Sequence, residues 1–170
     1  KKLKNGSWYP FYNSFYENNS LDPRMILLES RSGGALESNI LSLLKELSRE
    51  PYKNFNLVLS VRKNAESEIK EKLRKNSIQG VSFVHTGSVS YYRALSRAGY
   101  LVNDSSFPGR FVKKEGQIYL NTWHGTPLKK MGRDNRPEMV TMGNVLRNLL
   151  DSDYLVFPNR FMEEKMSGAY

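Results

Sequence analysis

Short apolar runs alternate along this chain with longer segments in which apolar residues recur every three or four positions. The first run, at residues 25–28 (MILL), is followed by the turn sequence SRSGG and then by apolar residues at helical spacing. Those helical positions are Leu36, Ile40, Leu43, Leu44 and Leu47. The same order recurs, which predicts strands at residues 25–28, 55–61, 81–84, 100–102, 118–123 and 153–157, and further helices at residues 66–75, 88–97 and from Arg160 onward.

This alternation predicts the fold class. Parallel strands joined by helices lie in sheets that are covered on both faces, so we expect an α/β fold with a Rossmann-like, mainly parallel sheet. In such sheets ligands bind beyond the carboxyl ends of the strands. The residues that we expect at this edge are Ser30, His85, Asp104, His124 and Asn159.

Residues 1–24 follow neither period. They are rich in Asn, Ser and aromatic residues, so we expect an irregular amino-terminal arm or linker. Residues 25–170 then form one Rossmann-like domain. Because the chain starts with KKLK rather than Met and stops inside a predicted helix, we expect it to be a fragment of a longer protein.

Composition narrows the classes of partner. The chain has 170 residues, of which 39% are apolar, and its 26 Lys and Arg against 17 Asp and Glu give a net charge of +9, which favours anionic partners. The absence of cysteine excludes disulfide scaffolds, thiolate zinc sites and cysteine nucleophiles. No apolar run approaches the roughly 18 residues of a membrane span, so a membrane role would be peripheral.

The strongest candidate for chemistry is the segment NTWHGTPLKK at residues 121–130. His124 follows an apolar strand and precedes a Gly-Thr-Pro turn, and residues 107–136 hold seven basic residues against two acidic ones. A histidine that titrates near neutral pH beside a cationic surface suits the deprotonation of a hydroxyl while phosphate charge is held. The alternative is a structural histidine, fixed in one tautomer, on a solvated basic loop.

Two further loops are weaker candidates. Ser32-Gly33-Gly34 opens the first long helix, where free N–H groups can receive an anion, but the GxGxxG and Walker spacings are absent and a plain turn is the alternative. His85 is expected to be an ordinary loop histidine and is left out of the catalytic candidates. No cluster of residues demands a metal or a cofactor.

The segment WHGTPLKKMGRD, with GQIYLNTW, NDSSFPG and ILLESRSGG upstream, resembles the CDP-glycerol glycerophosphotransferase family, the teichoic acid primases and polymerases of Gram-positive bacteria. The resemblance runs from about Met25 to the end of the chain. It implies a glycosyltransferase-B architecture, in which two Rossmann-like halves enclose the active site. This chain matches the amino-terminal, acceptor-side half, and the carboxyl-terminal, donor-binding half is absent from it.

The resemblance also implies site residues. His124 corresponds to the motif histidine proposed as catalytic base, and Asp104 matches an acidic position that either orients His124, binds acceptor hydroxyls or, alternatively, closes its own loop. Residues 35–39 (ALESN) depart from the family pattern, which puts an acceptor role for that loop in doubt. The expected substrate-binding residues are Asp104, Gly125, Thr126, Lys129, Lys130 and Arg133.

The leading hypothesis is the transfer of an alditol phosphate, with glycerol phosphate favoured, from CDP-glycerol or CDP-ribitol to a lipid-linked polyol-phosphate acceptor. His124 removes the proton of the acceptor hydroxyl, that oxygen attacks the β-phosphorus, and CMP leaves. We expect the enzyme at the cytoplasmic face of the membrane, bound peripherally to its anionic surface, and the fragment alone to be nearly inactive.

Two rival functions stay open. One is a basic binding module for nucleic acid or an anionic membrane, although no RNP-like or helix-turn-helix signature is present and nucleic acid is not expected. The other is half of a nucleotide-sugar glycosyltransferase of the same architecture, which fold analogy permits and the WHGTPLK match opposes.

Overall fold

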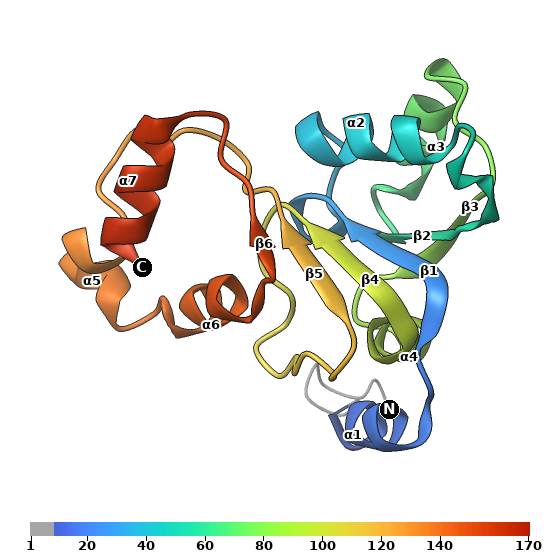
Figure 1. The fold of residues 1–170 in the computed structure, drawn as a ribbon, viewed down its shortest axis with the longest axis horizontal. Helices are drawn as coiled ribbons and strands as arrows, with labels where there is room; N and C mark the ends of the chain where they lie inside the picture. Colours follow the sequence, from blue (N-terminus) through green and yellow to red (C-terminus); the bar gives the residue numbers. More distant parts are fainter. Residues whose placement is uncertain (1–8) are drawn as a thin grey trace.

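The computed structural model describes residues 9–170, which form a six-stranded sheet flanked by helices (Figure 1). The strand order is β3-β2-β1-β4-β5-β6, and every neighbouring pair is parallel. The strands are β1 (Asp22–Glu29), β2 (Asn56–Val61), β3 (Val81–His85), β4 (Ala98–Asn103), β5 (Ile118–Asn121) and β6 (Tyr154–Leu155). The predicted α/β class and Rossmann-like parallel sheet are confirmed.

Helices cover both faces of this sheet. Figure 1 shows α2 and α3 on one face, α1 and α4 on the other, and α5, α6 and α7 beside the β6 edge. The α-helices are α1 (Tyr9–Asn18), α2 (Ser38–Leu47), α3 (Glu66–Lys75), α4 (Val89–Arg97), α5 (Arg136–Met139), α6 (Gly143–Asp151) and α7 (Arg160–Ala169). Short 3-10 turns lie at η1 (Arg31–Gly33), η2 (Tyr52–Asn54) and η3 (Gly132–Asp134).

The core has two layers because strand side chains alternate between the faces of the sheet. Leu28 of β1 packs with Ile40 of α2 and Ile69 of α3. Its neighbour Leu27 points the other way and packs with Tyr91 and Leu95 of α4. Each face of β1 is therefore buried, as the unbroken apolar run predicted.

The irregular structure expected over residues 1–24 is wrong for the described part of that segment. Residues Tyr9–Asn18 form α1, and β1 begins at Asp22 rather than at residue 25, whereas residues 1–8 lie outside the described residues. Tyr12 is buried and donates a hydrogen bond to the Val112 carbonyl at 3.0 Å, while the Lys114 ammonium donates to the Tyr16 and Asn19 carbonyls at the end of the helix. These contacts come from residues about 100 positions away, which explains why local periodicity did not predict the helix.

Two further differences lie near the β5 edge. No helix was predicted between the last two strands, but α5 and α6 lie there, and the spacing of Val145, Leu146 and Leu149 is the helical signal in the sequence. The strand predicted at residues 118–123 ends at Asn121, because Trp123 has a φ of +52°, a left-handed conformation that cannot continue a strand.

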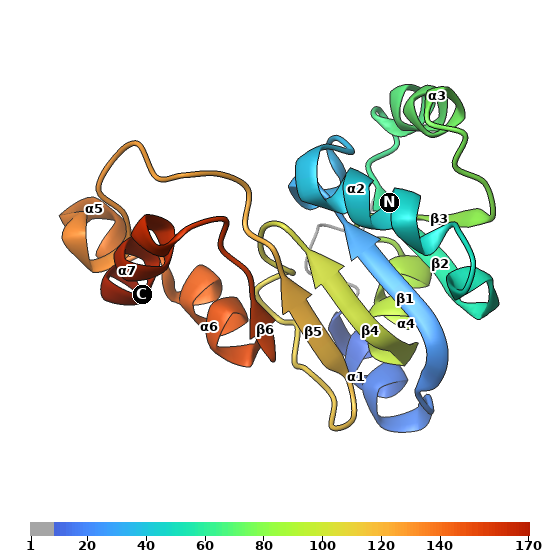
Figure 2. The same cartoon turned by 45° about the horizontal axis from the view of Figure 1, so that its top comes forward.

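The carboxyl ends of the strands define one edge of the sheet. The arrows of β1, β4 and β5 point to this edge, and the chain leaves β5 there on its way to α5 (Figure 2). Because the pairs are all parallel, the loops that follow these strands are neighbours although they lie far apart in the sequence.

Candidate functional site

The loops after β1 and β4 are joined by the side chain of Asp104. One carboxylate oxygen accepts a hydrogen bond from the Ser30 hydroxyl at 2.8 Å, and the other accepts one from the Arg31 backbone N–H, also at 2.8 Å. Ser32 and Ser105 add a hydroxyl contact of 3.3 Å between the same loops. Asp104 is buried, so its carboxylate holds the two loops together rather than facing solvent.

His124, in the loop after β5, is exposed. Its Nδ1 lies 2.5 Å from the backbone carbonyl oxygen of Asp104. A carbonyl oxygen only accepts, so Nδ1 carries the proton, and in the neutral ring Nε2 carries the free lone pair. No described residue forms a hydrogen bond with Nε2, which is therefore available to take a proton from a ligand.

Trp123 supports the ring of His124. The two rings stack with centroids 4.6 Å apart and an interplanar angle of 23°. Trp123 is buried against Met162 and Met166 of α7, which ties the histidine loop to the last helix.

The backbone and the side chain of Asp104 have different hydrogen-bond partners. Its backbone carbonyl orients His124, whereas its carboxylate is occupied by Ser30 and Arg31. This arrangement favours the loop-closing alternative and does not favour direct contact between the carboxylate and an acceptor hydroxyl. Asp104 therefore links the loop after β1 to the imidazole of His124.

The glycine and lysines of the motif lie on the exposed side of the loop. Gly125, Thr126, Lys129 and Lys130 are all exposed, and a Cβ added to Gly125 would meet nothing within 4 Å. The guanidinium of Arg133 donates to the Tyr170 carbonyl at 3.1 Å, so part of its hydrogen-bonding capacity is used within the fold. Open space therefore surrounds the turn that follows His124.

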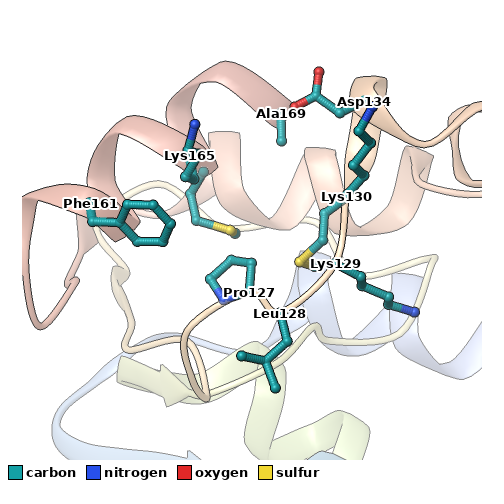
Figure 3. Close-up of a pocket in the computed structure, with 10 residues that line it drawn as sticks. Pro127, Leu128, Lys129, Lys130, Asp134, Phe161, Lys165 and Ala169 are labelled. Carbon is teal, nitrogen blue, oxygen red and sulfur yellow. The ribbon is translucent and has the colours of Figure 1, made fainter.

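A cavity of about 320 Å³ lies between this loop and α7. Pro127, Met131 and Met166 supply apolar lining, and Phe161 and Lys165 come from α7. In Figure 3 the Lys129 side chain points to one side, and the Lys130 and Lys165 side chains, some distance apart, point toward the top of the view. They spread positive charge over its rim rather than converge on one point.

Phe161 and Lys165 were missed by the sequence analysis. The Lys165 ammonium lies 5.7 Å from the centre of the Phe161 ring, as the i, i+4 spacing on a helix allows. That spacing was visible in the sequence. Nothing local showed that α7 folds back against the loop of residues 125–131.

Three other residues expected at the carboxyl edge have structural partners. His85 is the last residue of the outer strand β3, and its Nε2 lies 2.7 Å from a carboxylate oxygen of Glu66 on α3. The strands β2, β1 and β4 separate β3 from β5. Asn159 caps α7 by accepting a hydrogen bond from Met162 N–H at 3.0 Å. Ser30 belongs to the Asp104 contact. The structure therefore brings Asp104 and His124 together and leaves His85 apart.

A buried row of polar side chains lies beneath the site, on the sheet face that α4 covers. We call it the polar row; it consists of Ser60, Glu29, Asn103 and Asn121, aligned in register across β2, β1, β4 and β5. This row was not predicted from the sequence, although in all four strands a polar residue follows a short apolar run (LVLS, ILLE, YLVN, IYLN). Within the described chain, one Glu29 oxygen and the Asn103 amide nitrogen lack hydrogen-bond partners.

Burial raises the pKa of the Glu29 carboxyl to about 7, and the Asp104 carboxylate acts in the same direction while Arg62 opposes it. Burial also raises the pKa of the neighbouring Tyr91 phenol, well above its ordinary value. Glu29 is thus a carboxyl that holds its proton at pH values where exposed glutamates have lost theirs. Over residues 9–170, no three His, Asp or Glu side chains gather as a metal site would require.

The chain is similar to a known protein family and to individual members of it. The family described as CDP-Glycerol:Poly(glycerophosphate) glycerophosphotransferase matches residues 11–170. The teichoic acid poly(glycerol phosphate) polymerase of Staphylococcus epidermidis is 30% identical over 164 residues, which are 91% of this chain and 21% of that protein. The teichoic acid glycerol-phosphate transferase of Staphylococcus aureus is 27% identical over 154 residues, covering 86% of this chain and 37% of the relative.

A solved structure of a teichoic acid polymerase is also similar to this chain. The wall teichoic acid polymerase TagF, as a histidine-to-asparagine variant soaked with CDPG, matches with a TM-score of 0.80 and 27% identity, over 98% of this chain and 40% of that one. The chain therefore spans between 21% and 40% of the length of these relatives. The resemblance seen in WHGTPLKKMGRD is confirmed, and the chain belongs to the CDP-glycerol:poly(glycerophosphate) glycerophosphotransferase family.

Proposed function

We propose that this chain supplies the acceptor-side half of an active site that transfers glycerol phosphate from CDP-glycerol to a teichoic-acid-type polyol-phosphate acceptor. The observation that carries the proposal is the orientation of His124. Its Nδ1–H is held by the Asp104 carbonyl, and its Nε2 is bare and exposed. A general base needs this combination of a fixed ring and an accessible lone pair.

In the proposed reaction, Nε2 of His124 takes the proton of a terminal acceptor hydroxyl. The hydroxyl oxygen then forms a bond to the β-phosphorus of CDP-glycerol, the bond from that phosphorus to the bridging oxygen breaks, and CMP leaves with the electron pair. A phosphodiester results. The Asp104 carbonyl continues to accept the Nδ1 hydrogen bond when the ring becomes positively charged, which stabilises the protonated form.

Phosphoryl transfer depends chiefly on positioning and on stabilising negative charge. Lys129 and Lys130 at the cavity rim would hold acceptor phosphates, and Lys165 extends the same positive surface. Gly125 and Thr126 leave room for the acceptor to approach His124. Binding of the CDP group falls to the carboxyl-terminal half, which lies outside this chain.

Glycerol phosphate is proposed rather than ribitol phosphate because the relatives named above are poly(glycerol phosphate) polymerases or glycerol-phosphate transferases. The acceptor in the proposal is lipid-linked and polyanionic, and the chain carries a net charge of +9. We accordingly propose peripheral association with the anionic cytoplasmic face of the membrane. In the part of the chain that the structure describes, no helix has the length and apolar character to cross a bilayer.

The test is nucleotide release by the full-length protein with CDP-glycerol, CDP-ribitol and UDP-sugars, each with a soluble polyol-phosphate acceptor. We expect CMP release with CDP-glycerol, and a loss of about 10²- to 10⁴-fold in turnover in the His124→Ala variant, the usual contribution of a general base. UDP release would instead favour the glycosyltransferase alternative, and no release from any donor would favour a binding module. Near-normal turnover in His124→Ala would remove this residue from the mechanism.

A further inference from the structure

The side chain of Asn121, the last residue of β5, is fully buried, and both polar atoms of its amide form hydrogen bonds. Its Oδ1 accepts a hydrogen bond from the Trp123 backbone N–H at 2.8 Å. Its Nδ2 donates to the Ser105 backbone carbonyl at 2.8 Å and to the Oδ1 of Asn103 at 2.9 Å. One amide therefore contacts both the loop after β4 and the loop after β5.

These contacts flank the hydrogen bond that orients His124. Ser105 directly follows Asp104, whose carbonyl accepts from the imidazole, and Trp123 directly precedes His124. The distance between the Asp104 carbonyl and the His124 ring thus depends on two loops that a single side chain joins. Asn103 on the next strand accepts from both Asn121 and the Tyr119 hydroxyl, which holds the amide in place.

The backbone at Trp123 also needs this contact. An aromatic residue rarely adopts a φ of +52°, and surrounding interactions must hold it there. The bond from Trp123 N–H to Asn121 is one such interaction, and the stacking of Trp123 on His124 depends on the turn that results. The reversal at Trp123 brings the imidazole over the loop after β4.

We propose that Asn121 is a positioning residue for His124: its amide holds the Asp104 carbonyl and the Trp123 turn at the separation that keeps the imidazole proton on Nδ1 and the lone pair on Nε2. This inference rests on the proposed role of His124 as general base. Asn121 itself contacts no substrate in this proposal and acts only through the two loops.

Two variants of the full-length protein test the proposal. Asn121→Ala removes all the contacts, and Asn121→Asp keeps the size and the acceptor for Trp123 N–H but loses the donor to Ser105 and Asn103. The matched control is Gln117→Ala, just before β5. Gln117 is also a buried amide that accepts a backbone hydrogen bond, from Lys114 N–H at 2.8 Å, and it donates to the Leu95 and Ala98 carbonyls, so these hydrogen bonds lie outside the 121–124 segment.

The first measurement is the tautomer of His124, which fold stability alone does not set. Protein labelled with ¹⁵N-histidine is studied by solid-state NMR at about pH 8.5, above the ordinary histidine pKa of about 6.5, and the His124 signals are assigned by their loss in His124→Ala. We expect the Nδ1–H form in the wild type and in Gln117→Ala, and a shift toward the Nε2–H form in both Asn121 variants.

The second measurement separates kcat from KM. We expect both Asn121 variants to lose about 10- to 100-fold in kcat, the scale of a small misplacement of a catalytic group, with the KM for CDP-glycerol within about twofold of wild type. Gln117→Ala should keep its kcat within about threefold. If Asn121→Ala does not fold, the Asn121→Asp variant decides the question.

Folded Asn121 variants that keep the Nδ1–H tautomer, or that change tautomer without losing kcat, would overturn the positioning role. Failure of the proposed function gives a different result, because His124→Ala would then retain turnover whatever the tautomer in the Asn121 variants. The NMR signal needs no substrate, so the two ideas fail separately.

Discussion

His124 hydrogen-bonds to the main chain of Asp104 and not to its carboxylate. The histidine therefore has a partner that no side-chain substitution at position 104 removes. The carboxylate instead holds the loop after β1 through Ser30 and Arg31. A histidine oriented by a backbone carbonyl is positioned by the path of the loop, so residues that shape the loop control its chemistry.

The Asp104→Asn substitution tests this division of roles. It keeps the carbonyl but replaces a charged acceptor of two hydrogen bonds, so we expect the free energy of unfolding to fall by about 1–3 kcal/mol. Turnover should fall by less than about tenfold, well below the loss in His124→Ala. Thermal unfolding and steady-state kinetics measure the two effects. Stability like wild type, combined with a loss of turnover as large as that of His124→Ala, would mean that the carboxylate contacts substrate.

Glu29 should make the stability of the fold depend on pH. Its pKa is about 7 in the folded chain against an ordinary value of 4.5, so between these pH values the unfolded chain has lost a proton that the folded chain retains. The free energy of unfolding therefore falls as pH rises through this window, by about 3 kcal/mol in total, and stays low above it.

The Glu29→Gln variant removes that titration. We expect its stability to vary less between about pH 5 and pH 8 than that of the wild type, and to exceed the wild-type value at the higher pH. Thermal unfolding followed by circular dichroism across this range is the measurement. Parallel pH curves for the two proteins would show that Glu29 titrates normally.

Gly132 allows α7 to lie close to the end of the loop of residues 125–131. Its φ is +54°, and a Cβ there would lie 2.1 Å from the Ala169 carbonyl oxygen. Gly132→Ala should destabilise the chain by roughly 1–3 kcal/mol, whereas Gly143→Ala at the start of α6, where a Cβ meets nothing within 4 Å, should change stability by less than about 1 kcal/mol. Equal melting temperatures for the two variants would contradict the close approach.

Lys129 and Lys130 are expected to bind the acceptor rather than to act in the chemical step. The double variant Lys129→Gln, Lys130→Gln should raise the KM for a polyanionic acceptor by about 3- to 10-fold at low ionic strength, and added salt should reduce the difference. The control for net charge is the double variant Lys45→Gln, Lys75→Gln. Lys45 lies on α2, and Lys75 is the last residue of α3. A fall in kcat at unchanged acceptor KM would place these lysines in the chemical step instead.

Much of this protein is determined by its local sequence. Apolar runs and helical spacing predicted the six strands, and α3 begins and ends at the predicted residues, because periodicity is a property of neighbouring positions. The parallel order of strands and helices then placed Asp104 and His124 at one edge. The motif around His124 identified the family without any structure.

Only the tertiary structure decided which atoms meet. The helix α1 depends on Val112 and Lys114, about 100 residues away, and the partner of His124 is a backbone carbonyl that has no sequence signature. The polar row exists because four polar residues come into register across four strands: Ser60, Glu29, Asn103 and Asn121. The hydrophobic pattern constrains which face each strand buries, but the pairing of particular residues and the approach of loops depend on packing between segments far apart in the chain.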